Sequence, residues 1–336
     1  RRAGPFPHAL LATATHDHKR GEDMRARLAV LSEIPDEWQR NVDHWFDLNA
    51  PLRPQGLDAG DEYQLYQTLV GAWPPGLQAE DAEQLSIFCK RILGWRLKSL
   101  HEAKLRTSWT DPDDTYEKAS EEFVRVVLDP SRPAKFLQSM QTFVSRIAPA
   151  GALNALVQTV LRCTVPGVPD CYQGAEFWDL SLVDPDNRRA VSYRAGMGAL
   201  EENHPPAALL ADWLDGRVKQ ALIAALLNQR KQNLRLFAEG DYTPIEVRGA
   251  RAAHVLAFTR KCCEDSLLVA VPLRCATACA NTPLPSSDFW QDTALLLPGG
   301  FASRSTRHLL DGSFTPSRAE LQCRDLFAQF PIAVLT

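Results

Sequence analysis

The sequence lacks a long apolar run and an excess of basic charge. No stretch of the 336 residues approaches the roughly 18 consecutive apolar residues that a membrane-spanning helix needs, so we predict no membrane contact. The formal net charge of −4 provides no basic field, which argues against a nucleic acid as a partner. With 45% apolar residues the chain can bury a sizeable core, and its length allows more than one domain.

The eight cysteines include no CxxC pair, a spacing that many zinc sites share. Cys262-Cys263 and Cys275-x-x-x-Cys279 match no standard zinc-binding spacing either. We therefore expect no metal at the cysteines. Buried thiols that stay reduced are typical of a cytoplasmic protein, and this is the location that the sequence predicts.

A strand near the start of the chain is predicted to end in a charged loop. Residues 10–16 (LLATATH) are small, apolar and threonine-rich, as in a strand buried on both faces. Residues 16–23 (HDHKRGED) then bring two histidines and three carboxylates, and from Glu22 the apolar positions follow a helical period. Because catalytic groups lie at the C-terminal ends of strands in (β/α) folds, His16 and Asp17 are candidate site residues. The pair could also form an ordinary hydrogen bond within the loop.

Residues 33–149 are predicted to form a helical block. Trp38, Val42 and Trp45 lie at helical spacing, and we expect this aromatic stripe to form core rather than a binding surface. Asp61 is the expected N-cap of a following helix. The further predicted helices cover residues 80–106, 115–128 and 133–147.

A short apolar segment, residues 168–172 (VPDCY), follows Pro166-Gly167 and an apolar helix at 152–161. We predict a short buried strand there. Gly174 allows a sharp exit from it, and the polar residues Gln173 and Glu176 gather at its C-terminal end.

From Leu236 onward the sequence consists of short strand-forming runs separated by turns. This pattern predicts a small all-β domain, built as a two-sheet sandwich. The predicted strands cover residues 245–247, 255–258, 267–271, 294–297 and 332–335.

Several of these segments closely resemble the maltooligosyltrehalose synthases, a family of the α-amylase superfamily (glycoside hydrolase family 13). The run 167–176 (GVPDCYQGAE) is similar to the eighth barrel strand of that superfamily. The other matching segments are 15–20 (THDHKR), 61–74 (DEYQLYQTLVGAWP), 102–109 (EAKLRTSW) and 178–189 (WDLSLVDPDNRR).

The resemblance implies an α/β fold that comprises the C-terminal portion of a TIM (β/α)8 barrel. Strands seven and eight would flank a large helical insertion, and a small all-β sandwich would follow. The expected boundaries are residues 1–32 for strand seven and its helix, 33–149 for the insertion, 150–238 for strand eight and closing helices, and 239–336 for the β domain. The barrel strands that precede strand seven would be the missing partner of this chain.

The resemblance also implies an intramolecular transglucosylase of trehalose biosynthesis. Such an enzyme converts the reducing-end α-1,4 bond of a maltooligosaccharide into an α,α-1,1 bond with retention, and needs no cofactor or metal. Its nucleophile and acid/base lie on strands four and five, so this chain by itself is expected to be inactive. Asp17 would be the catalytic carboxylate that stabilises the transition state, and the sugar-binding residues would be His16, Lys19, Tyr172, Gln173 and Glu176. Asp184, Arg188 and Arg189 would either form structural salt bridges or contact the sugar.

Two alternatives come from other functional classes. A metal-dependent hydrolase could use His16, Asp17 and His18, together with His8, as ligands of a divalent ion. A non-catalytic carbohydrate-binding protein would instead use exposed aromatic residues of the β domain, where the candidates are Tyr242, Phe258 and Trp290.

Overall fold

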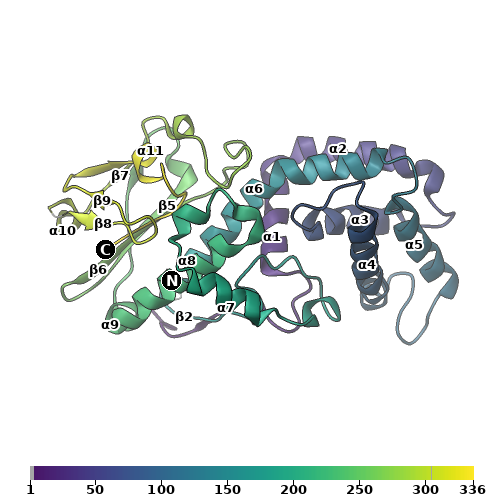
Figure 1. Ribbon diagram of the computed structural model, residues 1–336, viewed down its shortest axis with the longest axis horizontal. Helices are drawn as coiled ribbons and strands as arrows, with labels where there is room; N and C mark the ends of the chain where they lie inside the picture. The colour runs from purple at the N-terminus through teal and green to yellow at the C-terminus, as the bar shows by residue number, and fades with distance from the viewer. Residues whose placement is uncertain (1–3, 304) are drawn as a thin grey trace. The chain divides into compact units, whose positions relative to one another are not determined.

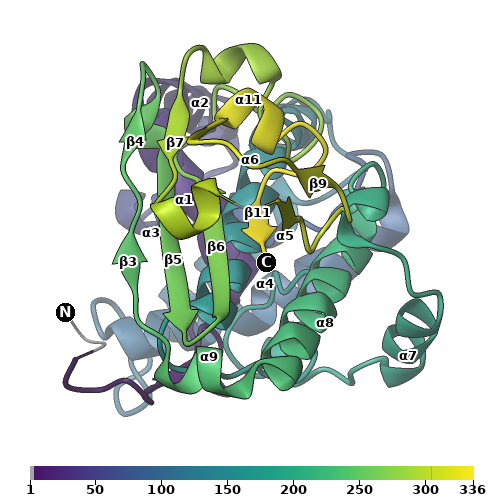
Figure 2. The ribbon, with the colours of Figure 1, turned by 90° about the vertical axis from the view of Figure 1, so that its left-hand side faces the viewer.

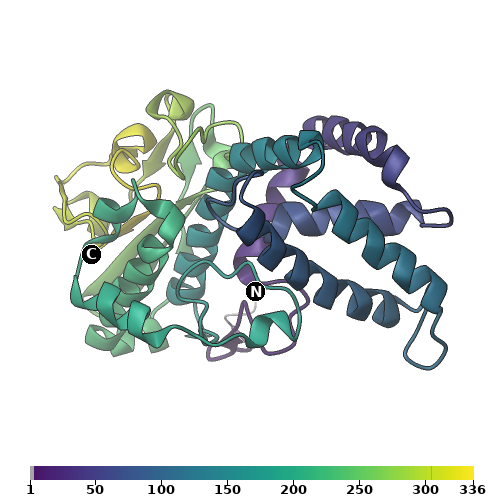
Figure 3. The ribbon, with the colours of Figure 1, turned by 45° about the vertical axis from the view of Figure 1, so that its right-hand side comes forward.

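The computed structural model describes residues 4–303 and 305–336, which divide into two compact units. One unit joins the residues up to 15 with 149–179 and 191–336, and the other joins 16–148 with 180–190. Figures 1 and 3 show the helices of residues 22–148 and the mixed helices and strands of the other unit. Within the described part of the chain, no helix is long and apolar enough to cross a membrane.

The unit of residues 16–148 and 180–190 is helical, as the sequence predicts. Its α2 begins at a proline, the residue that suits a first helical position. Asp58, and not the predicted Asp61, caps α3, because its carboxylate accepts the Gly60 amide at 2.8 Å. The helices are α1 (Glu22–Ala29), α2 (Pro35–Asn49), α3 (Ala59–Ala72), α4 (Ala82–Ala103), α5 (Asp114–Val127) and the first part of α6 (Lys135–Thr164).

Aromatic rings from α2 form the centre of this helical core, which confirms the predicted role of the stripe. Trp45 is fully buried, and its ring lies 5.6 Å from both Tyr66 and Phe143. Trp38 packs on Phe143 at 5.7 Å, so α2 lies alongside α6, as Figure 1 shows. The two edge-to-face contacts of Trp45 stabilise the core beyond the burial of the rings themselves.

The short helix α1 is fastened to the C-terminal end of α3. The buried guanidinium of Arg27 donates to the carbonyl oxygens of Val70, Gly71 and Trp73 at 3.3, 3.2 and 2.8 Å. A cation here satisfies carbonyls that a helix end leaves unpaired and complements the helix dipole. Burial lowers the pKa of Arg27 to about 10, and the charge of Asp23 opposes this shift.

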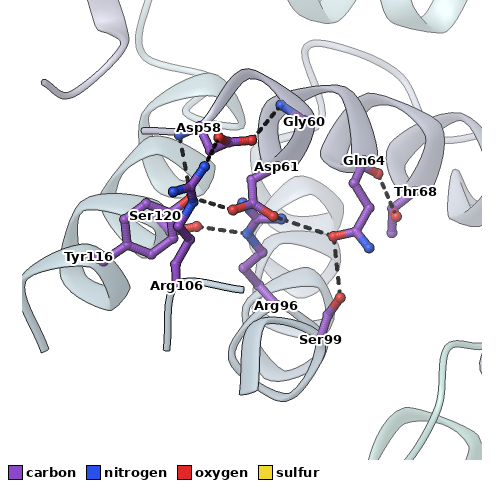
Figure 4. A network of polar contacts seen from close by, with 10 residues as sticks. All are labelled: Asp58, Gly60, Asp61, Gln64, Thr68, Arg96, Ser99, Arg106, Tyr116 and Ser120. Carbon is purple, nitrogen blue, oxygen red and sulfur yellow. Dashed lines mark hydrogen bonds and ion pairs between the residues drawn. The ribbon is translucent and has the colours of Figure 1, made fainter. Parts of the chain in front are cut away.

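A polar network around Arg96 joins α3, α4 and α5, as Figure 4 shows. The buried guanidinium of Arg96 donates to Ser120 Oγ at 2.7 Å and to Gln64 Oε1 at 3.3 Å. It lies 4.0 Å from the carboxylate of Asp61, which also accepts the Tyr116 hydroxyl. Burial, followed by the hydrogen bond to Asp61, raises the pKa of Tyr116 to about 12. The network fixes α4 against its neighbours from one side.

The predicted helices at 133–147 and 152–161 are one continuous helix, α6, with Pro149 inside it. An interior proline removes a hydrogen bond, yet Ile147, Ala150 and Leu153 on either side are at most 2% exposed. The burial of these residues outweighs the tendency of a proline to end a helix. Tertiary packing of this kind is not visible in a sequence pattern. Residues 135–148 of α6 belong to the helical unit and 149–164 to the other.

Two strands far apart in the sequence pair in parallel, as predicted. In β1 (Leu10–Leu11) and β2 (Val168–Pro169), Leu10 lies opposite Val168 and Leu11 opposite Pro169. The flanking amides of Val168 and Asp170 donate to Ala9 O at 3.0 Å and Leu11 O at 3.2 Å. Both strands are shorter than the predicted 10–16 and 168–172. The pairing of the two strands ends where the chain bends at Thr13. The hydroxyl of Thr13 accepts a hydrogen bond from the guanidinium of Arg162.

The described part of residues 240–336 contains three antiparallel sheets, and Figure 2 shows the two larger ones. Among the described residues one sheet has the order β11-β6-β5-β3 and the other β10-β7-β4, and β8 pairs with β9. Four of the five predicted strands match β5, β6, β7 and β11, and the fifth overlaps β4 by one residue. The strands are β3 (Thr243–Pro244), β4 (Val247–Arg248), β5 (Val255–Cys262), β6 (Asp265–Pro272), β7 (Ala294–Leu296), β8 (Thr306–Arg307), β9 (Phe314–Thr315), β10 (Glu320–Gln322) and β11 (Ala333–Leu335).

The described residues of the unit that contains these sheets also form five further α-helices. The longest of the five is α8. The helices are α7 (Tyr193–Glu201), α8 (Arg217–Gln232), α9 (Leu234–Glu239), α10 (Gly299–Ala302) and α11 (Cys323–Leu326).

Arg260 of β5 connects the four-stranded sheet to the ends of two helices, α6 and α9. Its guanidinium is 1% exposed and donates to Thr164 O, the last residue of α6, at 2.9 Å. It also donates to carbonyls at the end of α9 and beyond, at 2.7 to 3.2 Å: Leu236, Phe237, Gly240 and Asp241. Arg230 similarly donates to Cys163 O at 2.9 Å and Gly167 O at 3.1 Å, which secures the entry into β2.

Candidate active site

The segment that carries the candidate residues 16–20 is a loop between β1 and α1. His16, Asp17 and Lys19 are exposed, whereas His18 is 7% exposed. The loop ends at Gly21, whose amide donates to Ser181 O at 2.7 Å, and α1 begins at the next residue. The first turn of α1 carries Glu22 and Asp23, which suits the positive end of the helix dipole.

A second loop, residues 180–188, holds this segment in place. The His18 ring lies with Nε2 3.3 Å from Ser181 Oγ, and Arg20 forms a β-bridge with Leu182. Asn187 donates from Nδ2 to the carbonyl oxygen of His16 at 2.9 Å. The backbone of the site loop is therefore bound on both sides of Asp17.

The 180–188 loop is itself organised by a buried carboxylate. Asp186 accepts both Nε and a terminal nitrogen of Arg91, at 2.9 and 3.0 Å, and also the Leu182 amide at 2.9 Å. Arg189 lies 3.2 Å from the same carboxylate. The two parallel bonds from Arg91 are the bidentate arrangement in which a guanidinium and a carboxylate fit each other. Asp186 therefore holds the loop in place and is not a ligand-binding residue.

Six side chains of alternating charge connect the two loops with α4, and we call them the charge chain. Lys19 Nζ lies 3.4 Å from Asp17 Oδ1 and 3.1 Å from Glu102 Oε2. The other carboxylate oxygen of Glu102 lies 3.7 Å from Lys98 Nζ. Beyond these four, Lys98 donates to Asp184, and Asp184 Oδ2 lies 3.4 Å from Arg188.

The charge chain shifts the pKa of two members. The hydrogen bond to Glu102, ahead of the nearby charge of Asp17, raises the pKa of Lys19. The hydrogen bond from Lys98, supported by the charge of Arg188, lowers the pKa of Asp184. Both shifts favour the charged forms, so the alternation of charge persists through neutral pH. Asp184, Arg188 and Arg189 thus form salt bridges, one of the two roles considered from the sequence.

The candidates Tyr172, Gln173 and Glu176 belong to the other unit. They follow β2 in a turn in which the Ala175 amide donates to Tyr172 O at 3.0 Å. Gln173 is exposed, whereas Tyr172 and Glu176 are half-buried. Gly174 has a φ of 84°, and a Cβ there would lie 2.9 Å from a methyl of Val191, so a glycine is required at this exit.

The residues considered for a metal-dependent hydrolase or a carbohydrate-binding protein do not lie as those two functions require. Within residues 4–303 and 305–336, no three His, Cys, Asp or Glu side chains are grouped to hold a metal ion. In the β domain Phe258 and Trp290 are buried, and Tyr242 stacks on Phe258 at 4.7 Å. Of the three aromatic candidates, only Tyr242 therefore presents a surface to solvent.

Comparison with known proteins finds relatives that match this chain over its whole length. A protein of Mycobacterium tuberculosis (strain ATCC 25618 / H37Rv) described as a maltooligosyl trehalose synthase is 32% identical over 334 residues, which is 99% of this chain. The structure of maltooligosyltrehalose synthase from Arthrobacter ramosus matches 100% of this chain at 30% identity and a TM-score of 0.78. This chain is a relative of the maltooligosyltrehalose synthases. A hypothetical maltooligosyl trehalose synthase of Sulfolobus tokodaii matches 97% of it at 28% identity and a TM-score of 0.71.

The chain spans 38% of the length of the Mycobacterium tuberculosis relative and 39% of that of the Arthrobacter ramosus synthase. No family model matches the sequence. The resemblance first seen in short motifs is therefore confirmed as similarity to maltooligosyltrehalose synthases that extends over the whole chain.

The sequence pointed to the site loop but missed most of the residues that hold it. Lys98 and Glu102 lie four apart on one face of α4, which marks an ion pair without showing its outside partners. Asn187 and Ser181 lie in the segment 178–189 that resembles the family, but neither was a candidate for holding the loop. Contacts over more than 80 residues, such as Lys98 to Asp184, are set by the tertiary fold.

Proposed function

We propose that this chain forms part of an intramolecular transglucosylase. The enzyme would convert the reducing-end α-1,4 bond of a maltooligosaccharide into an α,α-1,1 bond, in the cytoplasm, for trehalose biosynthesis. The observation that carries the proposal is the match of the whole chain to relatives described as maltooligosyltrehalose synthases. The site loop, with an exposed carboxylate and an exposed ammonium, supports it.

In architectural terms, we infer that β1 and β2 are neighbouring strands seven and eight of a (β/α)8 barrel of the α-amylase superfamily. Their parallel pairing supports this assignment. The helices of residues 33–149 would then be an insertion between them, 150–238 would complete the barrel, and the sheets of 239–336 would pack as a sandwich. The other barrel strands would come from polypeptide that matches the rest of the relatives.

Each candidate residue has a role in this proposal. Asp17 would stabilise the positive charge that develops on the sugar in the transition state. His16 would hydrogen-bond the same ring, and Lys19 would contact the sugar at the reducing end. Tyr172, Gln173 and Glu176, which follow β2, would be further sugar-binding residues. Retaining chemistry also needs two carboxyl groups about 5–5.5 Å apart, which strands four and five would supply.

The reaction would then run as follows. A nucleophilic carboxylate would displace the reducing-end glucose and form a covalent glycosyl intermediate, while the second carboxyl group gives its proton to the leaving oxygen. The released glucose would then attack that intermediate through its anomeric hydroxyl in place of water, and the second carboxylate would take the proton of this hydroxyl as the carboxylate nucleophile leaves. Binding of this glucose by Lys19 would keep it in the site long enough to turn.

Reconstitution tests the proposal. The chain is incubated with maltopentaose alone and after co-expression with the part of the Arthrobacter ramosus enzyme that it does not match. Loss of reducing ends is measured. We expect no turnover by the chain alone and turnover by the combination.

The control is the Arthrobacter ramosus enzyme split at the equivalent point and co-expressed in the same way. Activity of that pair without activity of the mixed pair would contradict the proposal. Turnover by the chain alone would also contradict it, because two of the three carboxylates would then have to lie within these residues.

A further inference from the structure

Glu102 is an unfavourable residue for the position that it occupies in α4. It is the second-last residue of the helix, where a negative charge opposes the helix dipole. It also follows Lys98 by four residues, which is the weaker of the two orders for an ion pair on a helix. The helix itself therefore gains little from this carboxylate.

The partners of Glu102 outside the helix account for it. Its Oε2 lies 3.1 Å from the ammonium of Lys19, on the candidate active-site loop. Its Oε1 faces Lys98, whose ammonium in turn donates to Asp184 of the second loop. One carboxylate thus connects both loops to the end of one helix.

The helix that presents Glu102 is rigidly held. On its other side Arg96, which is 1% exposed, donates to Ser120 and Gln64, and Ser99 donates to Gln64 at 3.3 Å. Figure 4 shows these contacts reaching α4 from α3 and α5. A side chain on such an element holds its partner more accurately than one on a loop does.

The ammonium of Lys19 has three N–H donors. The carboxylates of Asp17 and Glu102 lie within reach of two of them, at 3.4 and 3.1 Å. The side chain of Lys19 remains 61% exposed, so one donor can meet a hydroxyl of a bound sugar. Without Glu102, this long and flexible side chain would have only its own loop as an anchor.

We propose that Glu102 is a positioning residue for Lys19, so that helix α4 orients the ammonium that meets the sugar. The proposal rests on the proposed function, because it takes Lys19 as the sugar-contacting group. It makes the helical insertion a working part of the site. Lys98 and Asp184 fix the carboxylate from the other side.

Glu102→Gln tests the proposal, because it keeps the shape of the side chain and removes its charge. Glu122→Gln, at an exposed position of α5, is the matched control. The lysines of the chain are reductively methylated with ¹³C, and the Lys19 resonance is identified by its absence in Lys19→Met. We expect the pKa of Lys19 to fall in Glu102→Gln and to stay unchanged in Glu122→Gln.

Stability and kinetics separate positioning from simple support of the fold. The melting temperature of Glu102→Gln should not fall, because an unfavourable charge leaves the helix end and an exposed ion pair stabilises little. In the reconstituted enzyme, Glu102→Gln should lower kcat/KM at least about fivefold, since small displacements of a binding group are costly. Lys19→Met should lower it by at least as much.

The possible results are distinct. An unchanged pKa of Lys19 in Glu102→Gln would overturn the inference directly. Loss of activity in Lys19→Met with full activity in Glu102→Gln would overturn it and leave the proposed function standing. Full activity in both variants would overturn it as well and would remove Lys19 from the proposed site, whereas the role of Asp17 would be decided by its own variant.

Discussion

Asn187 donates a hydrogen bond from Nδ2 to the carbonyl oxygen of His16 at 2.9 Å, which joins two segments 171 residues apart in the chain. The residue next to His16 is Asp17, so this bond fixes the backbone that carries the candidate carboxylate. A neutral hydrogen bond of this kind stabilises by about 1 kcal/mol.

Asn187→Ala should therefore loosen the site loop without unfolding the protein. The Gly21 amide, which donates to Ser181 O at 2.7 Å, reports on the loop. We expect it to exchange its hydrogen about fivefold faster, which corresponds to about 1 kcal/mol. Asn233→Ala, which removes a similar bond to Gln229 O, is the control and should leave Gly21 unchanged. Unchanged exchange in Asn187→Ala would mean that other contacts alone hold the loop.

Arg260 gives a prediction about stability. Arg260→Met would remove the donor of five carbonyl groups, three of them in buried hydrogen bonds, and each unsatisfied buried acceptor costs about 1–3 kcal/mol before relaxation. We expect a loss of about 3 kcal/mol or more, measured as a lower urea midpoint. Arg248→Met, whose side chain is exposed and pairs with Glu246, should stay within about 0.5 kcal/mol of the wild type. Equal midpoints for the two variants would show that Arg260 does not hold the helix ends.

The sequence predicted elements well where local pattern and burial agree. The periodic stripe of Trp38, Val42 and Trp45 lies in α2, and all three side chains are at most 7% exposed. The apolar runs of β5, β6 and β11 were found for the same reason. The strands that were missed, such as β3 and β9, are two residues long and exposed, so no apolar alternation marks them.

The errors arose where distant contacts decide the structure. Pro149 marks a helix end in any local pattern, but packing on both sides continues α6 through it. Residues 12–16 have the composition of a strand, yet Thr13 turns to Arg162 and the ladder stops at Leu11. The roles of Lys98 and Glu102 likewise depend on loops some 80 residues away on either side, which periodicity does not encode.

His308 makes the stability of the β domain sensitive to pH. Its side chain is 3% exposed, and burial lowers its pKa below the ordinary 6.5, against the charge of Asp311 at 3.7 Å. The unfolded chain takes up a proton near pH 6.5, whereas the folded protein does so only at lower pH. The contribution of His308 to the free energy of unfolding is therefore fully present above pH 6.5. It is lost as the pH falls from there through the pKa of His308 in the folded protein.

Urea unfolding at about pH 7.5 and about pH 5.5 checks this sign. The wild type should have the lower midpoint at the acidic pH. His308→Gln should reduce the difference between the two midpoints, because its side chain does not titrate. An equal difference in both proteins would mean that other groups cause the pH dependence.

Asp17→Asn gives the decisive test of the candidate carboxylate. Asp17 and Lys19 are both more than 60% exposed, so their ion pair contributes little to folding and the variant should melt as the wild type does. In the reconstituted enzyme, however, it should lower kcat by about 10²–10³-fold, because it removes a charge placed where positive charge develops. His16→Ala should lower kcat less, since it removes one neutral hydrogen bond to the sugar.

Asp47→Asn, at an exposed position of α2, controls for the loss of a charge. A kcat of Asp17→Asn within about threefold of wild type, with Asp47→Asn unaffected, would make Asp17 an ordinary loop residue, because no electrostatic contribution of the expected size would remain.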